Sequence, residues 1–162
     1  MKQGIYRFKY QNRREYAAFY AEAALQLYAP WIRLRRIDGI LPVPMYPRKQ
    51  RIRGYNQAEC FGRALSERTG IPMNPNLIRR CRNTKPLKLM NRQERQESLR
   101  GAFGLNQKEL LLLQRQAGGL YRNVLLVDDI ITTGATADAI ADLLYEAGVE
   151  HVYVLGICLA EA

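Results

Sequence analysis

The stretch Val124-Leu125-Leu126-Val127-Asp128-Asp129-Ile130-Ile131-Thr132-Thr133-Gly134-Ala135-Thr136 decides the fold of this chain. Its first four residues are all Val or Leu, which is typical of a fully buried strand in a parallel sheet. Two carboxylates follow at the C-terminal end of this strand, where open α/β sheets bind their ligands. A short loop of small hydroxyl residues and one Gly comes next, and a helix is predicted to begin at Ala137. The stretch therefore predicts a buried strand, a ligand-binding loop and a helix, in that order.

The loop between this strand and helix has the chemistry of an anion cradle. Backbone N–H groups in such a loop, together with the positive end of a helix, bind phosphate. Gly134 allows close approach of the main chain, and the neighbouring threonines add hydroxyl donors. Carboxylates repel phosphate but suit sugar hydroxyls, either directly or through a hydrated Mg²⁺. A ligand with both parts, such as a ribose phosphate, is therefore predicted, and an ordinary buried strand with a helix N-cap is the alternative.

The composition is that of an ordinary globular chain. The 162 residues are 48% hydrophobic and 25% charged, which predicts one domain, with an N-terminal helical region at 1–38 and a ligand-binding core at 39–162. No run approaches the ~20 apolar residues of a membrane-spanning helix, and the N-terminus has no apolar signal segment, so membrane insertion is not expected. The 3 cysteines have no Cys-x-x-Cys spacing, which favours a reducing cytoplasm and no zinc site.

Charge is distributed unevenly along the chain. Residues 1–100 carry 22 Lys and Arg against 7 Asp and Glu, whereas residues 101–162 carry 3 against 8. The basic part can neutralise a pyrophosphate or a nucleic-acid backbone. Net charge alone does not separate these two ligands from each other or from a solvated surface.

Hydrophobic periodicity predicts the other elements of the fold. Helices are expected at about 12–36, 57–69, 108–116 and 137–147, and strands at 40–44, at about 77–78 and at 152–158, the last of them buried. Pro30 is expected to kink or divide the first helix. Asn56 and Glu59 predict a capping box at the start of the second helix, and Gly70 predicts its end.

Two basic segments lie outside these elements. Residues 44–53 follow a strand and hold four basic side chains within positions 48–53, so we expect a loop at the ligand edge of the sheet. The residues expected to bind pyrophosphate there are Tyr46, Pro47, Arg48 and Arg51, and a solvated loop is the alternative. Residues 82–100 are basic and poor in large apolar side chains, which predicts a mobile loop with a short helix at about 92–98.

These features resemble one known group of proteins. The acidic pair followed by Thr-Thr-Gly-Ala-Thr resembles the phosphoribosyl-pyrophosphate (PRPP) motif of type I phosphoribosyltransferases. Residues 41–44 (LPVP), 53–59 (RGYNQAE), 84–86 (TKP) and 100–103 (RGAF), with Arg79, Arg80 and Arg95, resemble the ComF family. ComF proteins are phosphoribosyltransferase-like and are associated with natural competence and DNA uptake in bacteria. The resemblance covers nearly the whole chain.

The resemblance implies a fold, a ligand and a role for each motif. The fold is an α/β type I phosphoribosyltransferase core, a mainly parallel sheet flanked by helices. Asp128 and Asp129 would bind the ribose of PRPP and, through water, Mg²⁺. The 5-phosphate would be held by Thr132, Thr133, Gly134, Ala135 and Thr136. Arg53 and Arg95 are assigned to catalysis as neutralisers of the leaving pyrophosphate, and residues 85–100 would form a lid with the basic side chains Lys85, Lys88, Arg92 and Arg100.

The sequence departs from the family pattern at three places. The usual N-terminal four-cysteine zinc ribbon is not found, Leu87 stands where Gln is usual, and Ser98 stands where Asn is usual. Because the last two fall in the lid, two functions stay open. One is a phosphoribosyltransferase that acts on a nitrogen nucleophile. The other is a non-catalytic protein that senses PRPP or nucleotides, or binds single-stranded DNA, with proteins of the competence machinery as further partners.

Overall fold

The computed structural model describes residues 15–82, 99, 101–116 and 119–160. In chain order its elements are α2 (Tyr16–Leu34), β1 (Gly39–Pro42), α3 (Pro47–Arg53), α4 (Gln57–Thr69), β2 (Ile78–Arg80), β3 (Phe103–Leu105), α6 (Gln107–Gln116), β4 (Asn123–Ile131), α7 (Ala135–Glu146) and β5 (His151–Leu159). Within these residues, no helix is both long and apolar enough to cross a membrane.

A parallel sheet with the strand order β1-β4-β5 forms the centre of the molecule. The register pairs Leu41 with Leu126 on one side and Val154 with Leu126 on the other, so β4 lies in the middle. Strands β2 and β3 form a separate antiparallel pair beside it. The predicted α/β fold with a parallel sheet is therefore confirmed.

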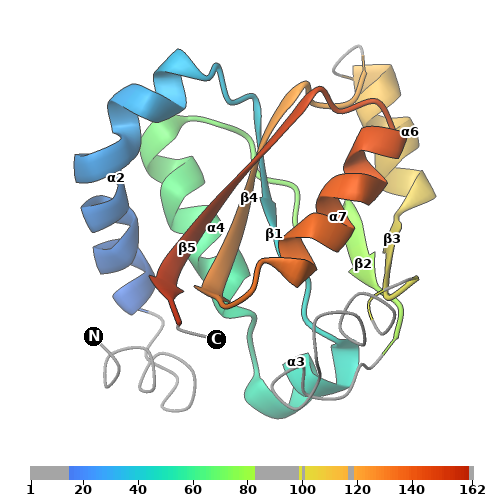
Figure 1. Ribbon diagram of the computed structural model, residues 1–162, viewed down its shortest axis with the longest axis horizontal. Helices are drawn as coiled ribbons and strands as arrows, with labels where there is room; N and C mark the ends of the chain where they lie inside the picture. Colours follow the sequence, from blue (N-terminus) through green and yellow to red (C-terminus); the bar gives the residue numbers. More distant parts are fainter. Residues whose placement is uncertain (1–14, 83–98, 100, 117–118, 161–162) are drawn as a thin grey trace.

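Helices cover both faces of this sheet (Figure 1). Helices α2 and α4 lie on one face, where Leu125 and Val127 of β4 pack in a core with Phe61 and Leu65 of α4. Helix α7 lies on the other face, where alternate residues of the same strand, among them Leu126, pack against it. Both faces of β4 are thus buried, which explains its unbroken run of Val and Leu.

The first helix is continuous through Pro30, so this proline does not divide the segment, which was one of the two predicted outcomes. Proline removes one backbone hydrogen bond of the helix. The last turn is nevertheless held by side-chain packing, because Ile32 is buried and the Trp31 ring lies 5.1 Å from that of Tyr153 in β5. Tertiary contacts therefore offset the local defect.

The basic segment after β1 is not the predicted loop but contains the short helix α3. Pro47 occupies its first turn, where the fixed φ of proline favours a helix and its missing N–H costs nothing. Gly54 ends it with a φ of 85° and donates its N–H to the Gln50 carbonyl at 2.7 Å. Pro47 and Gly54 thus mark the two ends of this short helix.

Two strands differ from their predicted form. Strand β4 continues to Ile131, beyond the acidic pair, because β5 pairs with it as far as Leu159. Strand β5 is only partly buried, with Val154 40% exposed, so the prediction of a buried strand at 152–158 is wrong. In the described residues β5 pairs only with β4, which leaves it at the edge of the sheet.

The close packing of α4 on the sheet depends on Gly62. A Cβ atom added there would lie 3.0 Å from Met73 Sδ and 3.1 Å from Val127 Cγ2. We expect Gly62→Ala to lower the free energy of unfolding by about 1 kcal/mol, because overpacking costs roughly 2 kcal/mol and the higher helix propensity of Ala returns about 1. Urea denaturation measures this, with Glu67→Ala on the exposed side of α4 as the control. A more stable Gly62→Ala variant would contradict the tight approach.

Candidate functional site

The predicted phosphate loop lies between the carboxyl end of β4 and the N-terminus of α7. Gly134 caps α7 with a φ of 79°, a left-handed conformation that favours glycine, and its carbonyl accepts from the Asp138 N–H at 2.9 Å. The helix begins at Ala135, two residues earlier than predicted, so Ala135 and Thr136 belong to its first turn. Thr132 and Thr133 are exposed. The loop therefore combines a helix N-terminus with accessible hydroxyls.

The two residues of the acidic pair differ in their position relative to this loop, because only Asp128 lines the cavity beside it. A cavity is lined by Val43, Asp128, Ile130, Ile131, Thr132, Thr133, Gly134, Thr136, Ala137 and Val154. Since successive side chains of a strand point to opposite faces, Asp128 shares the face of Leu126, and Asp129 shares that of Val127. Asp128 Oδ1 also accepts from the Asp129 N–H at 2.7 Å. The structure thus places Asp128 with the phosphate loop and Asp129 at the adjoining position of the strand.

The side chain of Asn56 connects the two ends of the segment between β1 and α4 by hydrogen bonds. Its Nδ2 donates to the Val43 carbonyl at 3.0 Å, and its Oδ1 accepts from the Ala58 N–H at 3.1 Å. The predicted N-cap is confirmed. The carboxylate of Glu59, the other residue of the predicted capping box, accepts a hydrogen bond from Arg63 at 3.0 Å. Because Val43 lines the cavity of the phosphate loop, Asn56 ties the start of α4 to the ligand edge of the sheet.

The basic side chains on this segment differ in their surroundings. Arg48 and Arg51 of α3 are exposed, as is Pro47, whereas Tyr46 is half-buried. Arg53 is half-buried, and its Nη1 donates to Gln57 Oε1 at 2.8 Å. Figure 1 places α3 beyond the carboxyl ends of β1 and β4. These residues are therefore brought to the edge at which the phosphate loop lies.

Arg80, at the end of β2, joins the site and was not assigned to it from the sequence. Burial lowers the pKa of its guanidinium, and the nearby Asp128 carboxylate raises that pKa in partial compensation. The guanidinium carbon also lies 5.4 Å from the centre of the Phe103 ring. A cation held beside the acidic pair suits a phosphorylated sugar. In the sequence it is marked only by its charge and by its place among the residues that resemble the ComF family.

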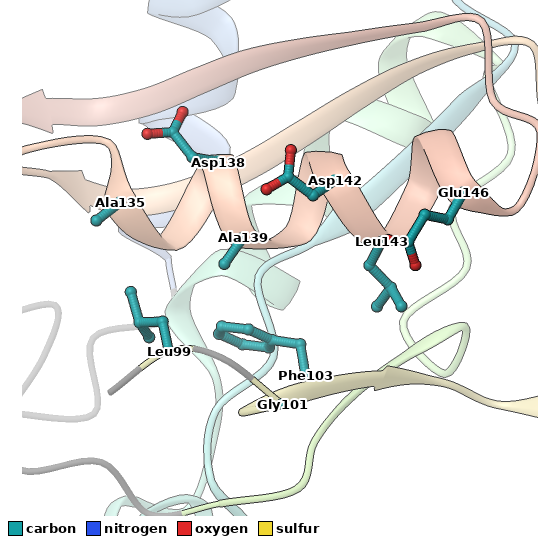
Figure 2. A pocket seen from close by; sticks show the side chains of 9 residues that line it. All are labelled: Leu99, Gly101, Phe103, Ala135, Asp138, Ala139, Asp142, Leu143 and Glu146. Atoms are coloured by element: carbon teal, nitrogen blue, oxygen red, sulfur yellow. The ribbon is translucent and has the colours of Figure 1, made fainter. Parts of the chain in front are cut away.

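A larger cavity, of about 540 Å³, lies between α7 and the residues Leu99, Gly101 and Phe103 (Figure 2). In Figure 2, Ala135, Ala139 and Leu143 project toward Leu99 and Phe103, while the carboxylates of Asp138 and Asp142 project away from that ring. Glu146 adds a third acidic residue to the lining. Three carboxylates disfavour phosphate there despite the size of the cavity. Charge, rather than volume, therefore favours an anion at the smaller cavity of about 30 Å³ beside the Thr loop.

A second basic region lies at the opposite edge of the sheet. Arg35 and Arg36 lie in the turn between α2 and β1, Arg122 precedes β4, and His151 begins β5, so all four lie near the amino ends of the strands. The Arg35 guanidinium stacks over the Tyr153 ring at 5.7 Å from its centre. Arg122 pairs with Glu150 at 2.6 Å, which neutralises part of the charge.

The remaining predicted site residues lie outside the described part of the chain. They are the catalytic candidate Arg95 and the lid residues Lys85, Lys88, Arg92 and Arg100. The predicted short helix at 92–98 lies there too. These assignments stay predictions.

Comparison with known proteins identifies the family to which this chain is similar. Residues 67–160 match the family described as "Phosphoribosyl transferase domain". Competence protein F of Haemophilus influenzae is 36% identical over 129 residues, which cover 78% of this chain and 52% of that protein. DNA utilization protein YhgH of Salmonella typhimurium is 30% identical over 157 residues, covering 95% and 65%, and that of Escherichia coli K12 is 31% identical over 121 residues. The chain thus spans about half to two thirds of the length of these relatives.

Proposed function

Because this chain belongs to the family of phosphoribosyl transferase domains, we propose that it binds PRPP at the carboxyl edge of its parallel sheet and transfers the phosphoribosyl group to a nitrogen nucleophile. The observation that carries the proposal is the cavity in which Asp128 meets the Thr132–Thr136 loop. A carboxylate beside an anion cradle fits a ligand that joins a sugar to a phosphate.

The donor set at this edge also fits Mg²⁺. This cation is usually bound through one or two carboxylates together with substrate phosphates, and it keeps several waters. Asp128, which lines the cavity, and Asp129, at the next position of β4, are both half-exposed and carry carboxylate oxygens that can act as ligands. When bound, Mg²⁺ would neutralise charge on the pyrophosphate. Asp128 and Asp129 would hold it through water.

The chain's own residues have separable tasks in this mechanism. The phosphate loop fixes the 5-phosphate, and Asp128 orients the ribose hydroxyls. Arg53 and Arg80 place positive charge where negative charge develops on the leaving pyrophosphate. The transfer breaks the bond between the anomeric carbon and the pyrophosphate oxygen and forms one to the nucleophile nitrogen. Positioning and charge stabilisation are sufficient for this reaction, so a covalent intermediate on the protein is not needed.

Calorimetric titration with Mg²⁺–PRPP, followed by assays of pyrophosphate release with a panel of bases and amines, tests the proposal. We expect binding that depends on Mg²⁺ and release that depends on one class of acceptor. Binding without release for any acceptor would favour a non-catalytic sensor. Absence of binding would contradict the assignment of the site.

Single-stranded DNA binding is a second candidate function, favoured by the basic region at the amino edge. Arg33, Arg35 and Arg36 are exposed near this edge. Arg35 and Arg36 line a hollow together with His151 and Tyr153, whose ring centres are 6.1 Å apart. Basic residues interleaved with aromatic rings are typical of surfaces that bind single strands. The names of the relatives, which refer to competence and DNA utilization, point the same way.

If DNA binds at the amino edge, three neutralised phosphates should give a slope of log affinity against log salt of about −2, at about 0.7 for each phosphate. We expect the variant with Arg33, Arg35 and Arg36 changed to Gln to lose this slope. Saturating PRPP should leave the slope of the wild type unchanged, because PRPP binds the opposite edge of the sheet. Fluorescence anisotropy at several salt concentrations measures this, with Arg48→Gln/Arg51→Gln as the control. Competition by PRPP would move the DNA site to the carboxyl edge, and absence of binding at low salt would exclude this function.

A further inference from the structure

The side chain of Gln57 is fully buried at the start of α4, yet its NH₂ group has no hydrogen-bond partner in the described part of the chain. Its exposed fraction is 0%, and its Oε1 accepts from Arg53 Nη1 at 2.8 Å. Nε2 has no hydrogen-bond acceptor among the residues that the structure describes. A guanidinium can only donate, so the bond to Arg53 fixes the oxygen toward it and the NH₂ group toward the interior. The arrangement is therefore dictated by Arg53 rather than by the needs of the amide.

A buried amide with an unused donor lowers the free energy of unfolding. An apolar side chain of similar size would avoid the unsatisfied N–H group and would pack among the neighbouring buried residues Ala58 and Phe61. Local rules of this kind are broken most often at functional sites. The position of Gln57 is consistent with a functional role, because its side-chain oxygen holds Arg53, a basic residue of the segment between β1 and α4.

We propose that Gln57 is a positioning residue that holds the Arg53 guanidinium in the orientation in which it binds the pyrophosphate of PRPP. This inference rests on the proposed function. Asn56 and Gln57 would divide the task, since Asn56 fixes the base of the segment at Val43 and Gln57 fixes its last helical residue. The two adjacent amides thereby pre-organise the segment between β1 and α4 before the ligand arrives.

The variant Gln57→Met tests this proposal because Met has a similar length and no hydrogen-bond donor. We expect it to weaken PRPP binding about tenfold, since a mobile guanidinium must be ordered on binding. In an Arg53→Ala background the same change should have no further effect, because Gln57 acts through Arg53. The melting temperature of Gln57→Met should be unchanged or raised. Calorimetry with PRPP and with inorganic pyrophosphate, and thermal denaturation, give these values.

Asn106→Ala is the matched control for a buried amide away from this segment. Asn106 is 7% exposed, and its Nδ2 donates to the Asn76 carbonyl at 3.1 Å. We expect this variant to lower the melting temperature and leave PRPP affinity unchanged. If Gln57→Met behaves in the same way, Gln57 is structural and the proposal fails. It also fails if Gln57→Met weakens binding equally with and without Arg53.

A measurement without ligand separates this proposal from the proposed function. Rotation of the Arg53 guanidinium about its Nε–Cζ bond can be followed by side-chain NMR in the free protein. We expect rotation to be faster in Gln57→Met than in the wild type. If rotation is faster but the wild type binds no PRPP, the function is wrong while Gln57 still restrains Arg53. If rotation is unchanged, the positioning role is wrong whatever the ligand.

Discussion

Changing Asp128 and Asp129 together to Asn is expected to weaken Mg²⁺-dependent PRPP binding about a hundredfold. Each charge-assisted hydrogen bond is worth about 1.5 kcal/mol, and the loss of two gives about 3 kcal/mol. Whether the double variant binds PRPP more weakly or more tightly distinguishes specific contacts from general electrostatics. PRPP is an anion, so general electrostatics alone would make binding tighter when two carboxylates are removed. Weaker binding therefore requires specific contacts with ribose hydroxyls or hydrated Mg²⁺.

Calorimetric titration of the double variant and of each single variant measures these contributions. Because Asp128 lines the cavity of the phosphate loop, we expect Asp128→Asn to account for the larger share. Asp142→Asn/Glu146→Gln removes the same charge from exposed positions of α7 and serves as the control. Affinity that is unchanged or higher in the double variant would exclude the carboxylates from the site.

The centre of the fold could be predicted because its signals are local. A run of four buried apolar residues, an acidic pair and a Thr-Gly loop specify strand, edge and helix start within thirteen positions. The ComF resemblance built on these and other motifs is confirmed by the similarity to Competence protein F. Elements whose form depends on tertiary contacts were predicted less well. Helix α2 continues through Pro30 because Trp31 and Ile32 pack on distant residues, which no local pattern records.

The candidate site shows the same division between local and distant signals. The phosphate loop is contiguous in sequence, so its residues were found together. Arg80 lies 48 positions before Asp128 in the numbering, on a strand pair outside the parallel sheet, and only the folded chain brings the two charges together. Gln57 could not be predicted to hold Arg53, because the 2.8 Å bond depends on the turn at Gly54.

Replacing Arg80 with Met is expected to weaken PRPP binding about thirtyfold, or about 2 kcal/mol, which is the typical value of a hydrogen bond to a charged group. The adjacent Arg79 is the matched control, because it carries the same charge but is exposed. We expect Arg79→Met to change affinity by less than about twofold, as is usual for an exposed charge at the rim of a site. Equal effects of the two variants would show that only net charge matters.

A structural role of Arg80 through Asp128 is tested by combining Arg80→Met with Asp128→Asn. The guanidinium lies near Asp128 and over the Phe103 ring, so it could act by holding the carboxylate alone. In that case the double variant would bind PRPP no more weakly than Asp128→Asn. We expect a further loss, because Arg80 retains its attraction for pyrophosphate when Asp128 is neutral. Calorimetric titrations of the four proteins in this cycle decide between a direct contact and an indirect one.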